Sequence, residues 1–166
     1  WAARRRGMSN PLRERALRLL AQREHARAEL KRKLARHAET DGYSEDQVDA
    51  LLDDLVARRL LSDARYAEMR VSVRGRRYGD ARLAQELRQT GVNTEAAKEA
   101  LAGAGDEMAR AQAVWARKFL ALPTETAERA RQTRFLMSRG FSSDTIRRLL
   151  RGETSEQSAA EEREEE

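Results

Sequence analysis

The sequence predicts an all-α fold in which three tandem three-helix repeats, each helix-turn-helix-like, form an elongated, curved array. The composition supports this first, because Ala, Leu, Arg and Glu dominate and only two of the 166 residues are proline. The absence of alternating Val, Ile and Thr runs argues against a sheet. Aromatic residues make up 5% and charged residues 37%, so the core must be thin and divided among small units.

A turn pattern that recurs at a fixed spacing is the third observation. A glycine, an apolar residue and then Ser or Asn begin at Gly42, Gly91 and Gly140, each 49 residues from the next. The glycine predicts a helix end with positive φ, and the Ser or Asn predicts the N-cap of the following helix. Three copies in register indicate repeats that pack against their neighbours.

The first repeat is expected to contain three helices. Its first helix begins at Asn10-Pro11, its second spans about residues 25–36, and its third begins with a capping box of Ser44 and Gln47. Apolar residues at helical spacing predict the buried positions. These positions are Leu12, Ala16, Leu19, Leu20, Leu30, Leu34, Val48, Leu51, Leu52 and Leu55.

The second repeat opens with the arginine-rich stretch 62–87, which is expected to form one helix, a tight break at Tyr78-Gly79, and a second helix. Tyr66 and Leu87 are predicted to be core residues. In the third repeat, the first helix is expected to bury one apolar set and the later helices another. The two sets are Met108, Ala111, Val114, Trp115 and Leu120, and Phe135, Leu136, Ile146, Leu149 and Leu150.

The expected divisions are a basic N-terminal arm (1–8), repeats at 9–61, 62–104 and 105–152, and an acidic tail (153–166). Seven glutamates against Arg163 leave the tail at −6, so the preceding residues carry +11 of the overall +5. The tail is either a solubilising appendage or a polyanion mimic that competes for the basic body. Because the chain begins at Trp1 rather than Met, we expect that a leading segment precedes it.

Residue patterns for catalysis are not found. His25 and His37 have no acidic or His partner three or four residues away in an inward-facing pattern and are expected at exposed or capping positions. No cysteine, phosphate loop or nucleophile motif is present, so we expect no enzyme activity, metal or cofactor. No apolar run approaches the length of a membrane helix, and the protein is expected to be cytoplasmic and monomeric.

The basic residues are the most informative feature. A basic body indicates a polyanion or an acidic protein surface as partner. For any single arginine, a solvated face is the better interpretation, whereas the whole set favours a surface that faces a polyanion. The candidate residues are Arg27, Lys31, Arg32, Arg70, Arg74, Arg76, Arg77, Arg82, Arg88, Arg131, Arg134, Arg147 and Arg148. Of these, Arg70, Arg74 and Arg77 are predicted to share one stripe of a helix.

A sequence-specific helix-turn-helix DNA reader is a weaker alternative. The third helix of the first repeat is acidic, and the matching helix of the second repeat begins with Glu95 and alanines. Base readout needs Asn, Gln or Arg clustered at a helix start, and the second repeat offers Glu95 and alanines there instead.

The sequence also resembles the bacterial RecX proteins over about residues 11–151. The resemblance rests on three motifs in order. The first motif spans residues 16–34 and includes Arg23-Glu24-His25-Ala26-Arg27. The second spans residues 61–87 and includes Leu61-Ser62-Asp63-Ala64-Arg65-Tyr66-Ala67, Arg74, Tyr78-Gly79, Arg82-Leu83 and Glu86-Leu87. The third is Arg134-Phe135-Leu136-Met137-Ser138-Arg139-Gly140-Phe141.

The resemblance implies three tandem three-helix repeats and a protein that regulates the RecA recombinase. Members of the family bind along or cap the RecA filament on single-stranded DNA, suppress its ATPase, strand-exchange and coprotease activities, bind DNA themselves, and are not enzymes. The runner-up is a general nucleic-acid-binding helical protein without a recombinase partner. Two departures from the family pattern are Arg70, where an apolar residue is usual, and the missing glycine before Tyr78.

Overall fold

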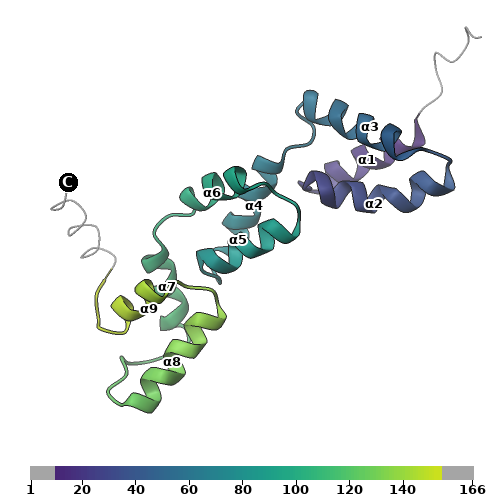
Figure 1. Cartoon of the computed structure of the whole chain (residues 1–166). Coiled ribbons are helices and arrows are strands. Elements are labelled where there is room, and N and C mark those ends of the chain that lie inside the picture. Colours follow the sequence, from purple (N-terminus) through teal and green to yellow (C-terminus); the bar gives the residue numbers. More distant parts are fainter. Residues whose placement is uncertain (1–9, 155–166) are drawn as a thin grey trace, which may run out of the picture.

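The computed structural model describes residues 10–154, and over this range its regular structure is entirely helical, which confirms the all-α prediction (Figure 1). The basic arm lies outside the described residues, as does the tail from residue 155. The helices are α1 (Pro11–Gln22), α2 (Arg27–Thr40), α3 (Glu45–Ala57), α4 (Asp63–Arg74), α5 (Asp80–Gln89), α6 (Thr94–Ala102), α7 (Glu107–Ala116), α8 (Thr126–Ser138) and α9 (Ser143–Leu149).

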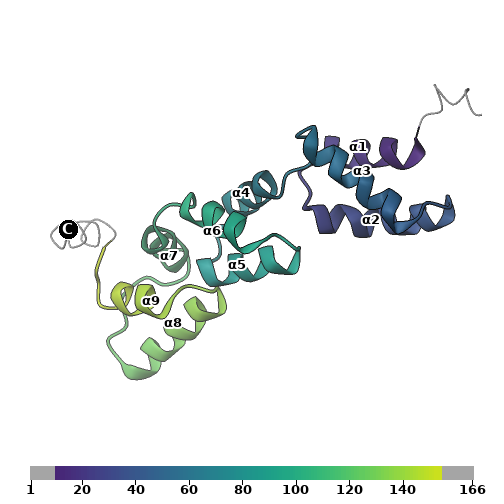
Figure 2. The same cartoon turned by 45° about the horizontal axis from the view of Figure 1, so that its top comes forward.

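The helices form three groups that follow one another in an elongated arrangement, visible in both views (Figures 1 and 2). We call α1–α3 repeat 1, α4–α6 repeat 2 and α7–α9 repeat 3. Each repeat has its own small hydrophobic cluster, centred on Leu34 and Leu52 in repeat 1, on Leu83 and Leu87 in repeat 2, and on Leu136 in repeat 3. Thin, separate cores make the contacts between neighbouring repeats important for stability.

The predicted turn chemistry is confirmed. Gly42, Gly91 and Gly140 have φ values of 74°, 84° and 82°, which glycine adopts at little steric cost. After them Ser44, Asn93 and Ser142 cap α3, α6 and α9 with side-chain oxygens. The capping box at the start of α3 forms as expected, so local sequence fixes where the third helix of each repeat begins.

Three expectations about individual positions were wrong. His25 is buried, with 1% of its surface exposed, and burial lowers the pKa of its imidazole. Lys33 can only donate a hydrogen bond, so His25 Nε2 accepts from Lys33 Nζ at 3.0 Å, and Nδ1 donates to the Arg23 carbonyl at 2.9 Å. Leu120 is fully exposed because α7 ends at Ala116, and Arg77 lies beyond the end of α4.

Repeats 1 and 2 meet at the short connection between α1 and α2. Ala26 from this connection is fully buried in the hydrophobic cluster of repeat 2. The next residue donates its backbone N–H to Asp63 Oδ1 at 2.7 Å, and Glu24 pairs with Arg65 at 2.8 Å. The start of α2 is therefore joined to the start of α4 by burial and by polar contacts.

Repeats 2 and 3 meet by backbone contact at Gly79 and Gly140. The N–H of Gly79 donates to the Arg139 carbonyl at 2.9 Å, and the N–H of Ala81 donates to the Gly140 carbonyl at 3.2 Å. A Cβ atom on Gly79 would overlap the backbone of Gly140 and Phe141. Gly79 has an ordinary φ of −80°, so the need for glycine comes from this close approach and not from its backbone conformation.

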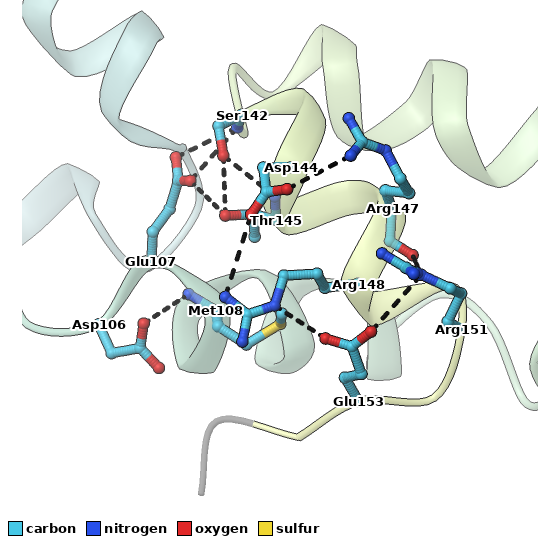
Figure 3. Close-up of polar contacts among 10 residues, drawn as sticks. All are labelled: Asp106, Glu107, Met108, Ser142, Asp144, Thr145, Arg147, Arg148, Arg151 and Glu153. Atoms are coloured by element: carbon cyan, nitrogen blue, oxygen red, sulfur yellow. Dashed lines mark hydrogen bonds and ion pairs between the residues drawn. The ribbon is translucent and has the colours of Figure 1, made fainter. Parts of the chain in front are cut away.

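A single carboxylate, that of Glu107 on α7, joins the starts of α5 and α9. Figure 3 shows its contacts with Ser142 and Thr145 at the start of α9. It accepts hydrogen bonds from the Asp80 N–H at 3.0 Å, the Ser142 N–H at 3.3 Å and the Thr145 hydroxyl at 2.7 Å. The N-cap of α5 is Gly79, which has no side chain, so Glu107 supplies the acceptor that a helix start requires. Arg110 reinforces the contact by pairing with Asp80 and donating to the Tyr78 carbonyl.

We expect Gly140→Ala to destabilise repeat 3 by about 1–3 kcal/mol more than Gly105→Ala does. Both glycines have positive φ. A Cβ atom added at Gly140 would overlap Arg82, whereas a Cβ atom added at Gly105 would have no neighbouring atom within 4 Å among the described residues. Gly105→Ala thus measures only the backbone strain, about 1–2 kcal/mol. Urea unfolding followed by Trp115 fluorescence measures both, and equal losses would contradict the close-approach interpretation.

Acid should loosen the contact between repeats 2 and 3. Burial by itself raises the pKa of Glu107, but hydrogen bonds from Thr145, Asp80 and Ser142 outweigh it and lower the pKa below its ordinary value of 4.5. The stabilisation is therefore complete above pH 4.5 and is lost as the pH falls through the lowered folded-state value.

Glu107→Gln is expected to lower the free energy of unfolding by about 1 kcal/mol at pH 7. This is about half of what hydrogen bonds to a fully buried charge contribute, because Glu107 is partly exposed to solvent. In thermal unfolding, its difference from the unmodified protein should shrink progressively as the pH falls below 4.5. Glu99→Gln, at an exposed carboxylate, is the control and should change neither the stability at pH 7 nor its dependence on pH. A difference that stays constant as the pH falls below 4.5 would rule out the carboxylate as its source.

Candidate functional site

Three of the candidate arginines surround one carboxylate on α5. Arg74 forms two hydrogen bonds to Glu86, at 3.1 and 2.6 Å, and Arg70 and Arg82 lie 3.5 and 3.6 Å from the same group. The Arg74 hydrogen bonds outweigh burial and lower the pKa of Glu86. One negative charge thus offsets part of three positive charges, and the cluster ties α4 to α5.

The aromatic ring of Tyr78 contacts two of these three arginines and one arginine of repeat 3. The guanidinium carbons of Arg74 and Arg82 both lie 4.4 Å from the centre of its ring, and that of Arg139 lies at 5.6 Å. These are cation–π distances. Because Arg139 is the C-cap residue of α8, this cation–π contact joins Tyr78 to repeat 3.

In repeat 1, two of the three candidates are engaged by acidic α3. Arg27 pairs with Asp53 and Asp49, and Lys31 pairs with Glu45 and Asp49 at 2.9 Å. These contacts raise the pKa of Lys31. The acidic helix that argued against a DNA reader is therefore the partner of the basic flank of α2.

Repeat 3 shows a similar division. Arg131 makes a two-pronged contact with Glu128 at 2.9 Å, Arg147 pairs with Asp144, and Arg148 pairs with Glu153 at 2.8 Å (Figure 3). Arg134 is exposed and has no ion pair with any other described residue. The same holds within residues 10–154 for four other candidates, Arg32, Arg76, Arg77 and Arg88.

Arg76 and Arg77 line a cleft between repeats 2 and 3 with a volume of about 420 Å³. The remaining lining residues are Val114, Arg117, Lys118, Phe135 and Arg139. Five cations thus meet without a carboxylate in the lining, and none of the five has an ion pair within the described range. The structure therefore brings together two predicted residues and three that were not predicted.

Arg117, Lys118 and Arg139 are the residues that sequence reasoning missed. Arg117-Lys118 is an adjacent basic pair just after α7, a signal that was readable from the sequence. Arg139 precedes the third turn glycine and was visible only as part of a motif. What no pattern indicated was that both positions lie beside the linker that carries Arg76 and Arg77.

Within residues 10–154 no group of three or more His, Asp or Glu side chains is arranged to hold a metal ion. None of the described helices has both the length and the apolar character needed to cross a bilayer. The feature that stands out is the gathering of arginine and lysine side chains in the lining of one cleft.

These observations define a class: an elongated helical-repeat protein with a cationic cleft between its second and third repeats. Models of the second and third three-helix domains of RecX match residues 62–101 and 105–150. The Regulatory protein RecX of Chromobacterium violaceum is 47% identical over 141 residues, covering 85% of this chain and 90% of that protein. The protein of the same description from Ralstonia nicotianae is 49% identical over 142 residues, 85% of this chain and 87% of that one.

The chain therefore belongs to the RecX family of regulatory proteins. A solved structure supports the same fold: the crystal structure of RecX from Lactobacillus salivarius aligns with a TM-score of 0.72, covering 85% of this chain and 93% of that one. Its sequence identity of 20% limits the comparison to the fold.

Arg74→Gln should lower the free energy of unfolding by about 1–2 kcal/mol, because it leaves the half-buried carboxylate of Glu86 without its main partner. Arg77→Gln, which breaks no ion pair between described residues, should stay within about 0.5 kcal/mol. Chemical denaturation of both variants gives the comparison. If the two variants lost similar amounts of unfolding free energy, the ion pair of Arg74 with Glu86 would not be a source of stability.

Proposed function

We propose that this protein modulates, mainly by inhibition, the RecA recombinase by binding the RecA–single-stranded-DNA filament. Binding would suppress the filament's ATPase, strand-exchange and coprotease activities. The observation that carries the proposal is membership of the RecX family across all three repeats, since the related proteins match 85% of this chain. The protein would act in the cytoplasm as a monomer, by binding and not by catalysis.

The shape of the protein supports this function. A filament presents the same surface repeatedly along a groove, and an elongated array of three repeats can contact it at several points (Figure 1). The candidate arginines that have no ion pair with another described residue are available to the filament or its DNA, both single- and double-stranded. The paired ones, Arg27 and Arg74 among them, primarily hold the repeats in shape.

The second candidate function is that of a general nucleic-acid-binding protein without a recombinase partner. The observation that favours it is the unpaired cationic cleft, which requires only a polyanion. The two functions differ in stoichiometry, because a filament modulator acts on RecA already assembled, whereas a competitor must cover the DNA.

RecA's DNA-dependent ATPase and strand exchange, measured while this protein is titrated, separate the two. We expect inhibition at well below one molecule per RecA subunit, with the DNA still mostly free of this protein. Inhibition that appears only when the DNA is saturated would support simple competition and reject the filament proposal.

A further inference from the structure

The cationic cleft is unusual because positive charge elsewhere in the described part of the chain is largely matched. Each repeat pairs some of its helix arginines with nearby carboxylates, as Arg27 does with Asp53, Arg74 with Glu86 and Arg131 with Glu128. The cleft gathers five cations from three segments, and none of the described residues in its lining is acidic. This concentration of like charge is unfavourable until an anion enters.

The architecture holds these cations together against their repulsion. Arg76 and Arg77 belong to repeat 2, whereas Arg117, Lys118 and Arg139 belong to repeat 3. The backbone hydrogen bonds at Gly79 and Gly140, and the contacts of Glu107, join the two repeats beside the cleft. The cleft is therefore preformed, and an anion that enters it contacts both repeats at once.

Phe135 lies in the cleft but is already covered by its neighbours. Lys118 Nζ lies 4.2 Å from the ring centre, the Arg139 guanidinium lies at 5.2 Å, and Phe119 packs against the ring edge-on at 5.4 Å. A nucleic-acid base needs a free ring face in order to stack. The ring therefore orients the cations, so the cleft contacts charge and not bases.

We propose that this cleft binds the phosphates of a single nucleic-acid strand, irrespective of base sequence. Five cations exceed what one carboxylate neutralises, whereas a strand supplies one negative charge per nucleotide. A volume of about 420 Å³ falls in the range that holds a ligand of nucleotide size and is too small to enclose a duplex. Arginine's planar fork matches two phosphate oxygens.

This inference deepens the proposed function by naming where the DNA strand is held, and it rests on that function only for the identity of the strand. The test is therefore made without RecA. Fluorescence anisotropy with labelled oligo-dT measures the affinity at several salt concentrations for the full chain and for Arg117→Gln/Lys118→Gln. The control is Arg15→Gln/Arg36→Gln, which removes two exposed arginines that have no ion pair within residues 10–154.

We expect the double variant in the cleft to bind oligo-dT and a mixed-sequence strand equally weakly. The slope of log affinity against log salt should fall in magnitude by about 1.4, at roughly 0.7 per lost phosphate contact. The control should keep the original slope, and circular dichroism should show that both variants are folded. An unchanged slope for the cleft variant overturns the proposal.

Two further arms distinguish other occupants. A duplex of equal length should lose less affinity than the single strand, and an equal loss would overturn the single-strand assignment. Poly-glutamate should bind weakly and be insensitive to the cleft variant. If it binds as tightly as oligo-dT and is equally weakened, the cleft recognises an acidic protein and the proposal fails. Either result leaves the RecA assay independent, because that assay measures inhibition with the unmodified chain.

Discussion

The close backbone approach of Gly79 and Gly140 is the constraint on which the arrangement of repeats 2 and 3 depends. Hydrogen bonds between these two turns leave no room for a Cβ atom at either position. Glu107 and Arg110 then satisfy the polar groups that the junction exposes. Because the repeats have small separate cores, a contact of this kind determines where the arginines of one repeat lie relative to those of the next.

Pairing between charges decides which arginines remain available to a partner. A basic face can be a binding surface or a scaffold, and the structure shows both in one molecule. The arginines around Glu86 and those facing α3 hold helices together, while the four arginines and one lysine of the cleft have no carboxylate among the described residues that line it. Counting basic residues therefore overstates the surface offered to DNA, and position relative to carboxylates is the better guide.

Much of the fold could be predicted because its signals are local. A glycine that ends a helix and the Ser44 capping box act within a few residues, and Leu52 and Leu87 follow helical periodicity. The predictions for individual residues were wrong where tertiary contacts, and not the local sequence, decide whether a side chain is buried. His25 is buried because the α1–α2 connection enters the junction with repeat 2, and Leu120 is exposed because α7 stops before it. Neither event has a local signal.

The helical class, the turns and caps of the repeats and, through its motifs, the family could all be predicted from the sequence. These depend on residue type and on spacing along the chain. Only the tertiary structure decided which cations share a site, because Arg76 and Arg139 are distant in sequence and meet where two turns touch. It also decided that Arg74 is held by Glu86, since a charge that is paired in space looks the same in the sequence as one that is free.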